Sequence, residues 1–330
     1  MSSNFGSKIK IQIFGQSHSE MLGVVIDGLP ANRVLDMQAI TDFLERRRGN
    51  QNEFSTKRKE SDIPKIVSGL IDNKTCGAPL CAVFENNDAK SADYEKFRYI
   101  PRPSHADYNA FIKYNGANDI RGGGHFSGRM TLPLCFSGAV CMQLLAYRGI
   151  NINAHITQIK NEKDPEKMIE VMMNAAKNGD SVGGIIECNI TGLPVGIGEP
   201  MFGGIENQIS AAVFAVPAVR GIEFGAGFAA AGMFGSEHND EYFVENGQIS
   251  LKTNNAGGVL GGITTGMPLI FRVAIKPTPS IFKEQNSVDL KNMQNVKLQI
   301  TGRHDSCIVL RAVPCIEAAA AIALINLTEV

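Results

Sequence analysis

Three segments of the chain are apolar on nearly every helical face, and a helix of that kind has to be buried. They are TLPLCFSGAVCMQLLAYRG at 131–149, IENQISAAVFAVPAVRG at 205–221 and VPCIEAAAAIALINL at 313–327. We expect a buried helix at each, and we judge all three too short or too interrupted to span a membrane. Such helices require other elements to cover them.

Short β-rich runs, each bounded by glycine, proline, asparagine or aspartate, provide that cover. They occupy residues 9–14, 23–28, 65–70, 81–86, 183–193 and 268–275. Helical patterns predict two further helices, at 37–48 and at 164–179. The mixture predicts an α+β or α/β fold in which sheets sandwich a layer of helices. Because no low-complexity linker divides the chain, we expect one domain over residues 1–330.

Charge and cysteine usage exclude several classes of function. The formal net charge of −1 and the pI near 6.6 give the whole chain no attraction to nucleic acid or to an acidic membrane. The seven cysteines are scattered without a CxxC pair, which argues against a disulfide framework and a zinc knuckle. With neither a signal-peptide pattern nor eighteen consecutive apolar residues, we expect a cytoplasmic protein in a reducing compartment.

Histidines are the first candidates for chemistry, because imidazole titrates near neutral pH. Five of the six stand in polar, turn-like segments: His18, His105, His125, His238 and His304. His155, in NINAHITQI, is instead typical of a satisfied core histidine. No HxH or HExxH spacing occurs, so we expect no metal site.

Arginines are concentrated in the same polar segments as the histidines. Arg102, Arg121, Arg129 and Arg303 lie close to these histidines, and a basic stretch covers residues 46–58. Guanidinium groups bind carboxylate and phosphate through paired hydrogen bonds, so the clustering indicates a small polyanionic ligand. The alternative is that these arginines are simply solvated surface residues. That alternative accounts for the basic stretch at 46–58 but accounts poorly for the arginines beside the histidines.

Glycine-rich loops are the remaining feature. GGG stands at 122–124 within RGGGHFSGRMT, and NNAGGVLGGITTGMP covers 254–268. Neither has the spacing of a Rossmann or P-loop phosphate site. Glycine lets backbone amides approach a phosphate or a planar ring, but the same segments suit plain turns equally well.

Taken in order along nearly the whole chain, the motifs resemble the chorismate synthase family. The resemblance is carried by FGQSHSEMLGVVIDGLPA, RRR, STKRKESD, NNDAKSADY, RPSHADYNAFIKYNGANDIRGGG, VPAVRGIEFGAGF, TNNAGGVLGGITTGMP, KPTPSI and GRHDSCIVLRAVPCIEAA. It implies an α+β fold, a β-α-β sandwich with helices packed between antiparallel sheets, and a homotetramer. The implied reaction converts 5-enolpyruvylshikimate 3-phosphate to chorismate and phosphate by anti-1,4-elimination with reduced FMN.

The resemblance also implies residue roles. His18 would be an acid near the departing phosphate or the flavin, His105 would protonate or stabilise the reduced flavin, and Asp305 would work with flavin N5 to take up the C6 proton. The implied substrate residues are Arg47, Arg102, Ser127, Arg129 and Arg303. The implied FMN residues are His125, Phe126, Ser127, Ala218, Gly261, Lys276, Pro277, Thr278, Ser280 and Arg303. NADPH would act only indirectly, through a possible separate flavin reductase.

Several positions depart from the family pattern. Gln16 and Ser19 replace a usual glutamate and glycine, Glu53 replaces a frequent substrate arginine, and His125 and Phe126 replace an arginine and a serine on the flavin side. Two alternatives therefore stay open beside chorismate synthase. One is a divergent flavin-binding homologue that acts on another phosphorylated acid, and the other is a non-enzymatic flavin-binding paralogue.

Overall fold

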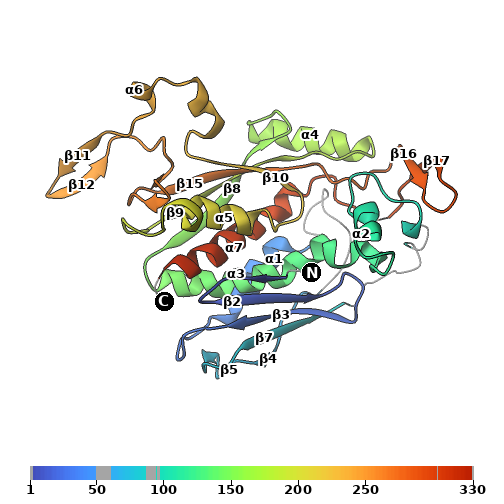
Figure 1. The fold of residues 1–330 in the computed structure, drawn as a ribbon, viewed down its shortest axis with the longest axis horizontal. Helices are drawn as coiled ribbons and strands as arrows, with labels where there is room; N and C mark the ends of the chain where they lie inside the picture. Colours follow the sequence, from blue (N-terminus) through green and yellow to red (C-terminus); the bar gives the residue numbers. More distant parts are fainter. Residues whose placement is uncertain (1–2, 50–60, 87–93, 95–96, 303, 329–330) are drawn as a thin grey trace.

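Two antiparallel sheets enclose a layer of helices in this computed structural model, which describes residues 3–49, 61–86, 94, 97–302 and 304–328 (Figure 1). The first sheet has the order β1-β2-β3-β7-β4, formed by Asn4–Phe5, Lys10–Gly15, Met21–Asp27, Leu80–Glu85 and Lys65–Ser68. The second has the order β10-β15-β9-β8, formed by Val219–Phe224, Leu269–Ile275, Gly184–Thr191 and Asn151–Ile159. The predicted α+β sandwich is confirmed.

The helix layer consists mainly of α3 (Thr131–Ala146) and α7 (Val309–Leu327), with α1 (Met37–Arg47) and α5 (Ile205–Val213) beside α7. Helix α3 packs against the first sheet and α7 against the second (Figure 1). The two helices touch closely at Gly138, where an added Cβ would lie 2.2 Å from the Cβ of Ala318. Their all-round apolarity is therefore explained by neighbours on every side.

The expectation that these helices are too short for a membrane is wrong on length. Gly128–Ala146 and Val309–Leu327 are each long and apolar enough to cross one by length and composition. However, 78% and 89% of the two apolar windows are buried inside the fold. Buried helices at the core of a sandwich fold also meet this criterion of length and composition, and α3 and α7 form the core of this fold.

The segment 205–221 does not form one helix as expected. Helix α5 ends at Val213, and β10 begins at Val219 to pair with β15 at the edge of the second sheet. Pro217 has no backbone N–H and disfavours helical conformation in the residue before it, so the chain turns there. The turn places Pro217 and Ala218 in the wall of a cavity.

The expectation for His155 is also wrong. Strand β8 alternates buried and exposed residues, with Ile152 and Ala154 facing the helices. His155 lies on the opposite face, where its side chain is 59% exposed and stands 3.9 Å from Glu187 on β9. A period of two, rather than overall apolarity, decides the environment of this imidazole.

The remaining elements surround the sandwich. They are α2 (Asp107–Lys113), α4 (Pro165–Lys177), α6 (Gly235–His238), and the hairpins β5–β6 (Leu70–Ile71, Lys74–Thr75), β11–β12 (Tyr242–Glu245, Gln248–Leu251), β13–β14 (Val259–Leu260, Ile263–Thr264) and β16–β17 (Glu284–Asp289, Gln294–Gln299). Helix α4 lies on the outer side of the second sheet (Figure 1). The Asp164 carboxylate caps α4 by accepting hydrogen bonds from Glu166 N and Lys167 N.

Candidate active site

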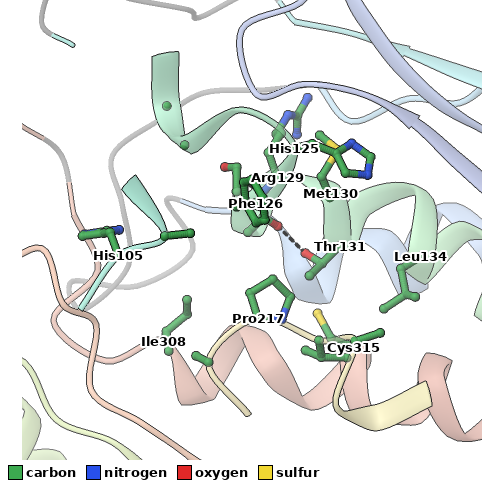
Figure 2. Close-up of a pocket in the computed structure, with 18 of the residues that line it drawn as sticks. His105, His125, Phe126, Arg129, Met130, Thr131, Leu134, Pro217, Ile308 and Cys315 are labelled. Carbon is green, nitrogen blue, oxygen red and sulfur yellow. Dashed lines mark hydrogen bonds between the residues drawn. The ribbon is translucent and has the colours of Figure 1, made fainter. Parts of the chain in front are cut away.

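A cavity of about 1230 Å³ lies beside the helix layer, bounded by the starts of α3 and α7, the glycine loop and the segments around residues 105 and 278. Figure 2 shows its wall, with His105 and Cys315 on opposite sides. The predicted site residues that line it are Arg47, Arg102, His105, His125, Phe126, Ser127, Arg129, Ala218, Lys276, Thr278, Ser280 and Asp305. His18, Pro277 and Gly261 are not among the lining residues, and Arg303 and Glu53 lie outside the described residues.

Two buried arginines converge on one carboxylate in this wall. Arg47, on the last turn of α1, donates from Nη1 to Asp62 Oδ2 at 3.1 Å and from Nε to Thr131 Oγ1 at 2.7 Å. Arg129 donates from Nη1 to Asp62 Oδ1 and from Nε to Asn86 Oδ1 at 3.0 Å. Residues far apart in sequence thus hold two guanidinium groups side by side at the cavity.

Asp62 is the counter-ion of this pair. Burial alone would raise the pKa of its carboxyl, but the charges of Arg47 and Arg129 outweigh burial and lower the pKa below its usual value. Sequence reasoning missed Asp62, because the run STKRKESD shows only a basic, polar stretch. The carboxylate leaves the two cations neutralised only in part, so an anionic ligand still meets net positive charge.

Arg102 is a third buried arginine of the wall. Its Nε and Nη2 donate to the two oxygens of Asp107, each at 2.8 Å, and its guanidinium carbon lies 5.1 Å from the centre of the Phe97 ring. The bidentate pair fixes the plane of the guanidinium. Asp107 opens α2, and it too went unnoticed in the sequence although it stands in the same RPSHAD motif.

His105 lies near Arg102 and contacts a second predicted site residue. Its Nε2 and Ser280 Oγ are 2.8 Å apart, and Ser280 is buried. Burial and the charge of Arg102 lower the pKa of His105 to about 3. The imidazole is therefore neutral at physiological pH, and a negatively charged ligand beside it would raise that pKa again.

Asp305 reaches the cavity from the loop before α7. Its two carboxylate oxygens accept hydrogen bonds from Arg311 Nη1 at 3.1 and 2.9 Å. Arg311 also donates from Nε to the backbone oxygen of Arg47 at 2.9 Å. Arg311, which the sequence did not single out, thus ties the carboxylate to the end of α1 and to the arginine pair.

The glycine loop Arg121–Phe126 closes another side of the cavity. Its three glycines have φ of 59°, 83° and 55°, a region that side chains disfavour. A Cβ on Gly122 would lie 2.4 Å from Ser17 Oγ and 2.7 Å from His18 Nε2. The buried His18 ring therefore lies directly behind Gly122, and it makes a T-shaped contact with the Tyr94 ring at 5.2 Å between ring centres.

His125 and Phe126 take different positions in this loop. His125 Nδ1 lies 2.7 Å from the Gly15 carbonyl oxygen, so it is the donor, and His125 Nε2 lies 2.8 Å from Ser3 Oγ. The imidazole thus links the loop to β2 and to the N-terminal segment, with both nitrogens engaged. The Phe126 ring is 47% exposed and lines the cavity as an apolar surface.

Of the remaining predicted cofactor residues, four line the cavity: Ala218, Lys276, Thr278 and Ser280. Lys276 Nζ donates to Ser104 O at 2.9 Å, and Lys276 N donates to Ala218 O at 2.9 Å. Ala218 has a φ of 76°, which is strained for a residue with a Cβ. Gly261 lies in the turn between β13 and β14, outside the cavity.

The site is chemically suited to a small organic polyanion. It combines buried arginines, a neutral imidazole and a carboxylate with apolar surfaces from Phe126, Leu134, Pro217 and Ile308 (Figure 2). In the part of the chain that the structure describes, no three histidine, cysteine or acidic side chains are grouped to hold a metal ion. The fold and cavity define a β-α-β sandwich with an arginine-lined cavity.

Comparison with known proteins identifies the family within this structural class. The family model described as chorismate synthase matches residues 9–328. The chorismate synthase of Chitinophaga pinensis is 48% identical, over 97% of this chain and 95% of the relative, and that of Thermococcus gammatolerans is 45% identical over the same shares. A solved chorismate synthase structure superposes with a TM-score of 0.75 at 25% identity, covering 98% of this chain and 92% of that one.

The chain belongs to the chorismate synthase family. It is accordingly an enzyme, a lyase of the shikimate pathway that acts on a small-molecule substrate. Neither open alternative, the divergent homologue or the non-enzymatic paralogue, gains support from these comparisons.

Proposed function

We propose that the cavity converts 5-enolpyruvylshikimate 3-phosphate to chorismate and phosphate by anti-1,4-elimination, with reduced FMN bound beside the substrate. The observation that carries this proposal is the convergence of buried Arg47 and Arg129 on Asp62 in the wall that also holds Arg102. The substrate carries a phosphate and two carboxylates. Guanidinium groups already fixed in place stabilise the charge that accumulates on phosphate as it leaves.

The residues around the cavity support distinct roles. Arg47, Arg129 and Ser127 bind the anionic groups, and Arg102 is held ready by its ion pair with Asp107. Asp305, a cavity-lining carboxylate held in place by Arg311, would work with flavin N5 to take up the proton lost from ring carbon 6. His18 remains the proposed acid near the phosphate, reached past Gly122, which has no side chain to block the imidazole.

His105 fits a neutral hydrogen-bonding role in the free protein, because its pKa of about 3 leaves it unprotonated. Next to an anionic ring its pKa rises, and it then becomes able to supply a proton. Its hydrogen-bond partner Ser280 fixes the ring orientation. The sequence-based role of His105 therefore depends on the ligand that it faces.

The volume and lining of the cavity support the binding of a flavin. At about 1230 Å³ it exceeds the roughly 300–1,000 Å³ of a pocket for one small ligand. Phe126, Pro217 and Ala218 offer apolar surface for the ring system, and Lys276, Thr278 and Ser280 offer polar groups. Reduced FMN, when bound, would lend electron density transiently and be recovered unchanged, which aids the loss of a weakly acidic proton.

We extend the proposal to the setting of the enzyme. It would be a cytoplasmic homotetramer whose chain folds as one domain. The main hydrophobic core, which includes residues from both sheets, supports the single domain. NADPH would serve only indirectly, through a separate flavin reductase, and no nucleic acid or membrane would take part. Light scattering should give four chains per particle, and NADPH should not be consumed without an added reductase.

An anaerobic assay with photoreduced FMN and 5-enolpyruvylshikimate 3-phosphate tests the activity. We expect chorismate absorbance and phosphate to appear together in equal amounts. His105→Ala and Asp305→Ala should each lower turnover by a factor on the order of 100 or more. His155→Ala is the matched control, because His155 lies on the exposed face of β8 and should leave turnover unchanged.

Absence of both products from the wild-type protein would reject the proposed reaction. Flavin binding, measured separately by fluorescence, would then show whether the cavity still holds FMN. Near-normal turnover of either variant would remove that residue from the mechanism.

A further inference from the structure

Two buried cysteines from the central helices meet at the wall of the cavity. Cys135 on α3 and Cys315 on α7 are 180 residues apart in sequence, and their Sγ atoms are 3.7 Å apart. Cys315 lines the cavity, whereas Cys135 is fully buried behind it. Figure 2 shows the sulfur of Cys315 beside Leu134 and Pro217.

The two helices touch one turn beyond the cysteines. Gly138 and Ala318 each lie three residues beyond the corresponding cysteine, and a Cβ on Gly138 would stand 2.2 Å from that of Ala318. A disulfide needs Cβ atoms only about 3.5–4.5 Å apart. For the bond to form, the Sγ atoms, now 3.7 Å apart, have to approach to about 2.0 Å.

The two thiols differ chemically. For Cys315, the hydrogen bond from Cys135 and the positive charge of Arg47 together outweigh the effect of burial, so its pKa is lowered. Burial raises the pKa of Cys135. Because the thiolate is the reactive form, the sulfur that faces the cavity is also the better nucleophile.

We propose that Cys315 and Cys135 form a reversible oxidation site for hydrogen peroxide or another small hydroperoxide that enters the cavity. The Cys315 thiolate attacks the peroxide, so that an S–O bond forms, the O–O bond breaks and the departing hydroxide takes up a proton to give water. Cys135 then attacks the Cys315 sulfur, forming the S–S bond and releasing a second water with its own proton. The two thiols lose two electrons, and the peroxide gains them.

The position of the cysteine pair beside the cavity bears on where the peroxide comes from and on which residues oxidation would affect. Reduced flavin reacts with dioxygen to yield hydrogen peroxide, so the oxidant arises in the same cavity if the proposed cofactor is correct. Thr131, whose hydroxyl helps to lower the pKa of Cys315, also accepts the 2.7 Å hydrogen bond from Arg47. Oxidation thus takes place one contact away from the anion site.

Peptide mapping after treatment with added hydrogen peroxide tests the proposal without depending on flavin or turnover. The native wild-type protein is oxidised, alkylated in denaturant and digested. We expect a disulfide-linked pair of peptides containing Cys135 and Cys315, which dithiothreitol separates. Cys141→Ser, in a buried cysteine of the same helix, is the matched control and should give the same linked pair.

Variants then test the order of the two steps. Cys135→Ser should accumulate a sulfenic acid at Cys315 that dimedone traps, whereas Cys315→Ser should give no trapped product at Cys135. The proposal is overturned if the wild-type peptides of Cys135 and Cys315 stay reduced while the exposed Cys76 is oxidised. If a serine variant fails to fold, judged by circular dichroism, the wild-type map alone decides.

Discussion

Replacement of Asp62 by asparagine should destabilise the protein strongly, because the carboxylate is the shared counter-ion of two buried arginines. The side chain of Asp62 is 2% exposed, and those of Arg47 and Arg129 are 4% and 7% exposed. Removing one partner of a buried ion pair costs about 3–5 kcal/mol, since the remaining charge stays desolvated. At about 2.1 cal/mol/K per residue, the 330 residues convert this loss into a fall in Tm of about 4–7 °C.

The assay is urea or thermal unfolding of wild type, Asp62→Asn and a matched control, Glu45→Gln. Glu45 pairs with Arg48 at 3.1 Å, but their side chains are 48% and 28% exposed. Such a pair contributes less than about 1 kcal/mol to the free energy of unfolding. If Asp62→Asn and Glu45→Gln lower the free energy of unfolding equally, the reasoning that burial makes loss of the Asp62 carboxylate more costly is refuted.

Inorganic phosphate provides a second readout on the same variant. With Asp62 neutral, the two arginines carry uncompensated charge, so phosphate should bind and stabilise Asp62→Asn more than wild type. Phosphate at ten times its Kd adds about 1.4 kcal/mol to the free energy of unfolding. A variant that gains no more from phosphate than wild type would show that Arg47 and Arg129 do not form an anion site.

Three further outcomes follow from close contacts and from titration. Gly122→Ala should lower the free energy of unfolding by about 1–3 kcal/mol, because the backbone there is strained for alanine and the new Cβ would clash with the buried His18 ring. Gly128→Ala is the control, because a Cβ there would have nothing within 4 Å. It should change the free energy of unfolding little in the same denaturant titration. Gly138→Ala should cost about 3 kcal/mol, because its Cβ would overlap Ala318; an unchanged Tm would contradict this packing. In the folded protein the pKa of His105 is about 3, below its ordinary value of 6.5. Between these two pH values His105 therefore binds a proton in the unfolded chain but not in the folded one. The free energy of unfolding should consequently fall as the pH drops from about 6.5 towards 3. His105→Gln should remove that part of the pH dependence, and identical slopes for variant and wild type would refute the assigned pKa.

The layered architecture could be predicted because its signal is strong and local. Helices α3 and α7 are apolar on all faces, and only a position between two sheets satisfies them. The helix predicted over 205–221 failed because Pro217 turns the chain into β10. The core environment predicted for His155 is wrong because NINAHITQI forms a strand, whose period of two places His155 on the exposed face.

The candidate site could be predicted only as a set of motifs. Family resemblance named Arg47, Arg129 and Asp305, but neither pattern nor spacing revealed that Asp62 joins the two arginines. The pairing of Cys135 with Cys315 was equally invisible, since it joins residues 180 positions apart. Contacts of this kind depend on how helices and loops meet in space, which the chain order does not record.

The helix layer connects the hydrophobic interior to the cavity wall. Thr131, which holds Arg47 at the cavity, is the first residue of α3, and Gly138 two turns later is pressed against α7. A substitution that shifts these helices is therefore expected to alter both the free energy of unfolding and the position of the Arg47 guanidinium in the cavity wall. Packing in the hydrophobic interior and the position of an arginine in the cavity wall are therefore linked through α3.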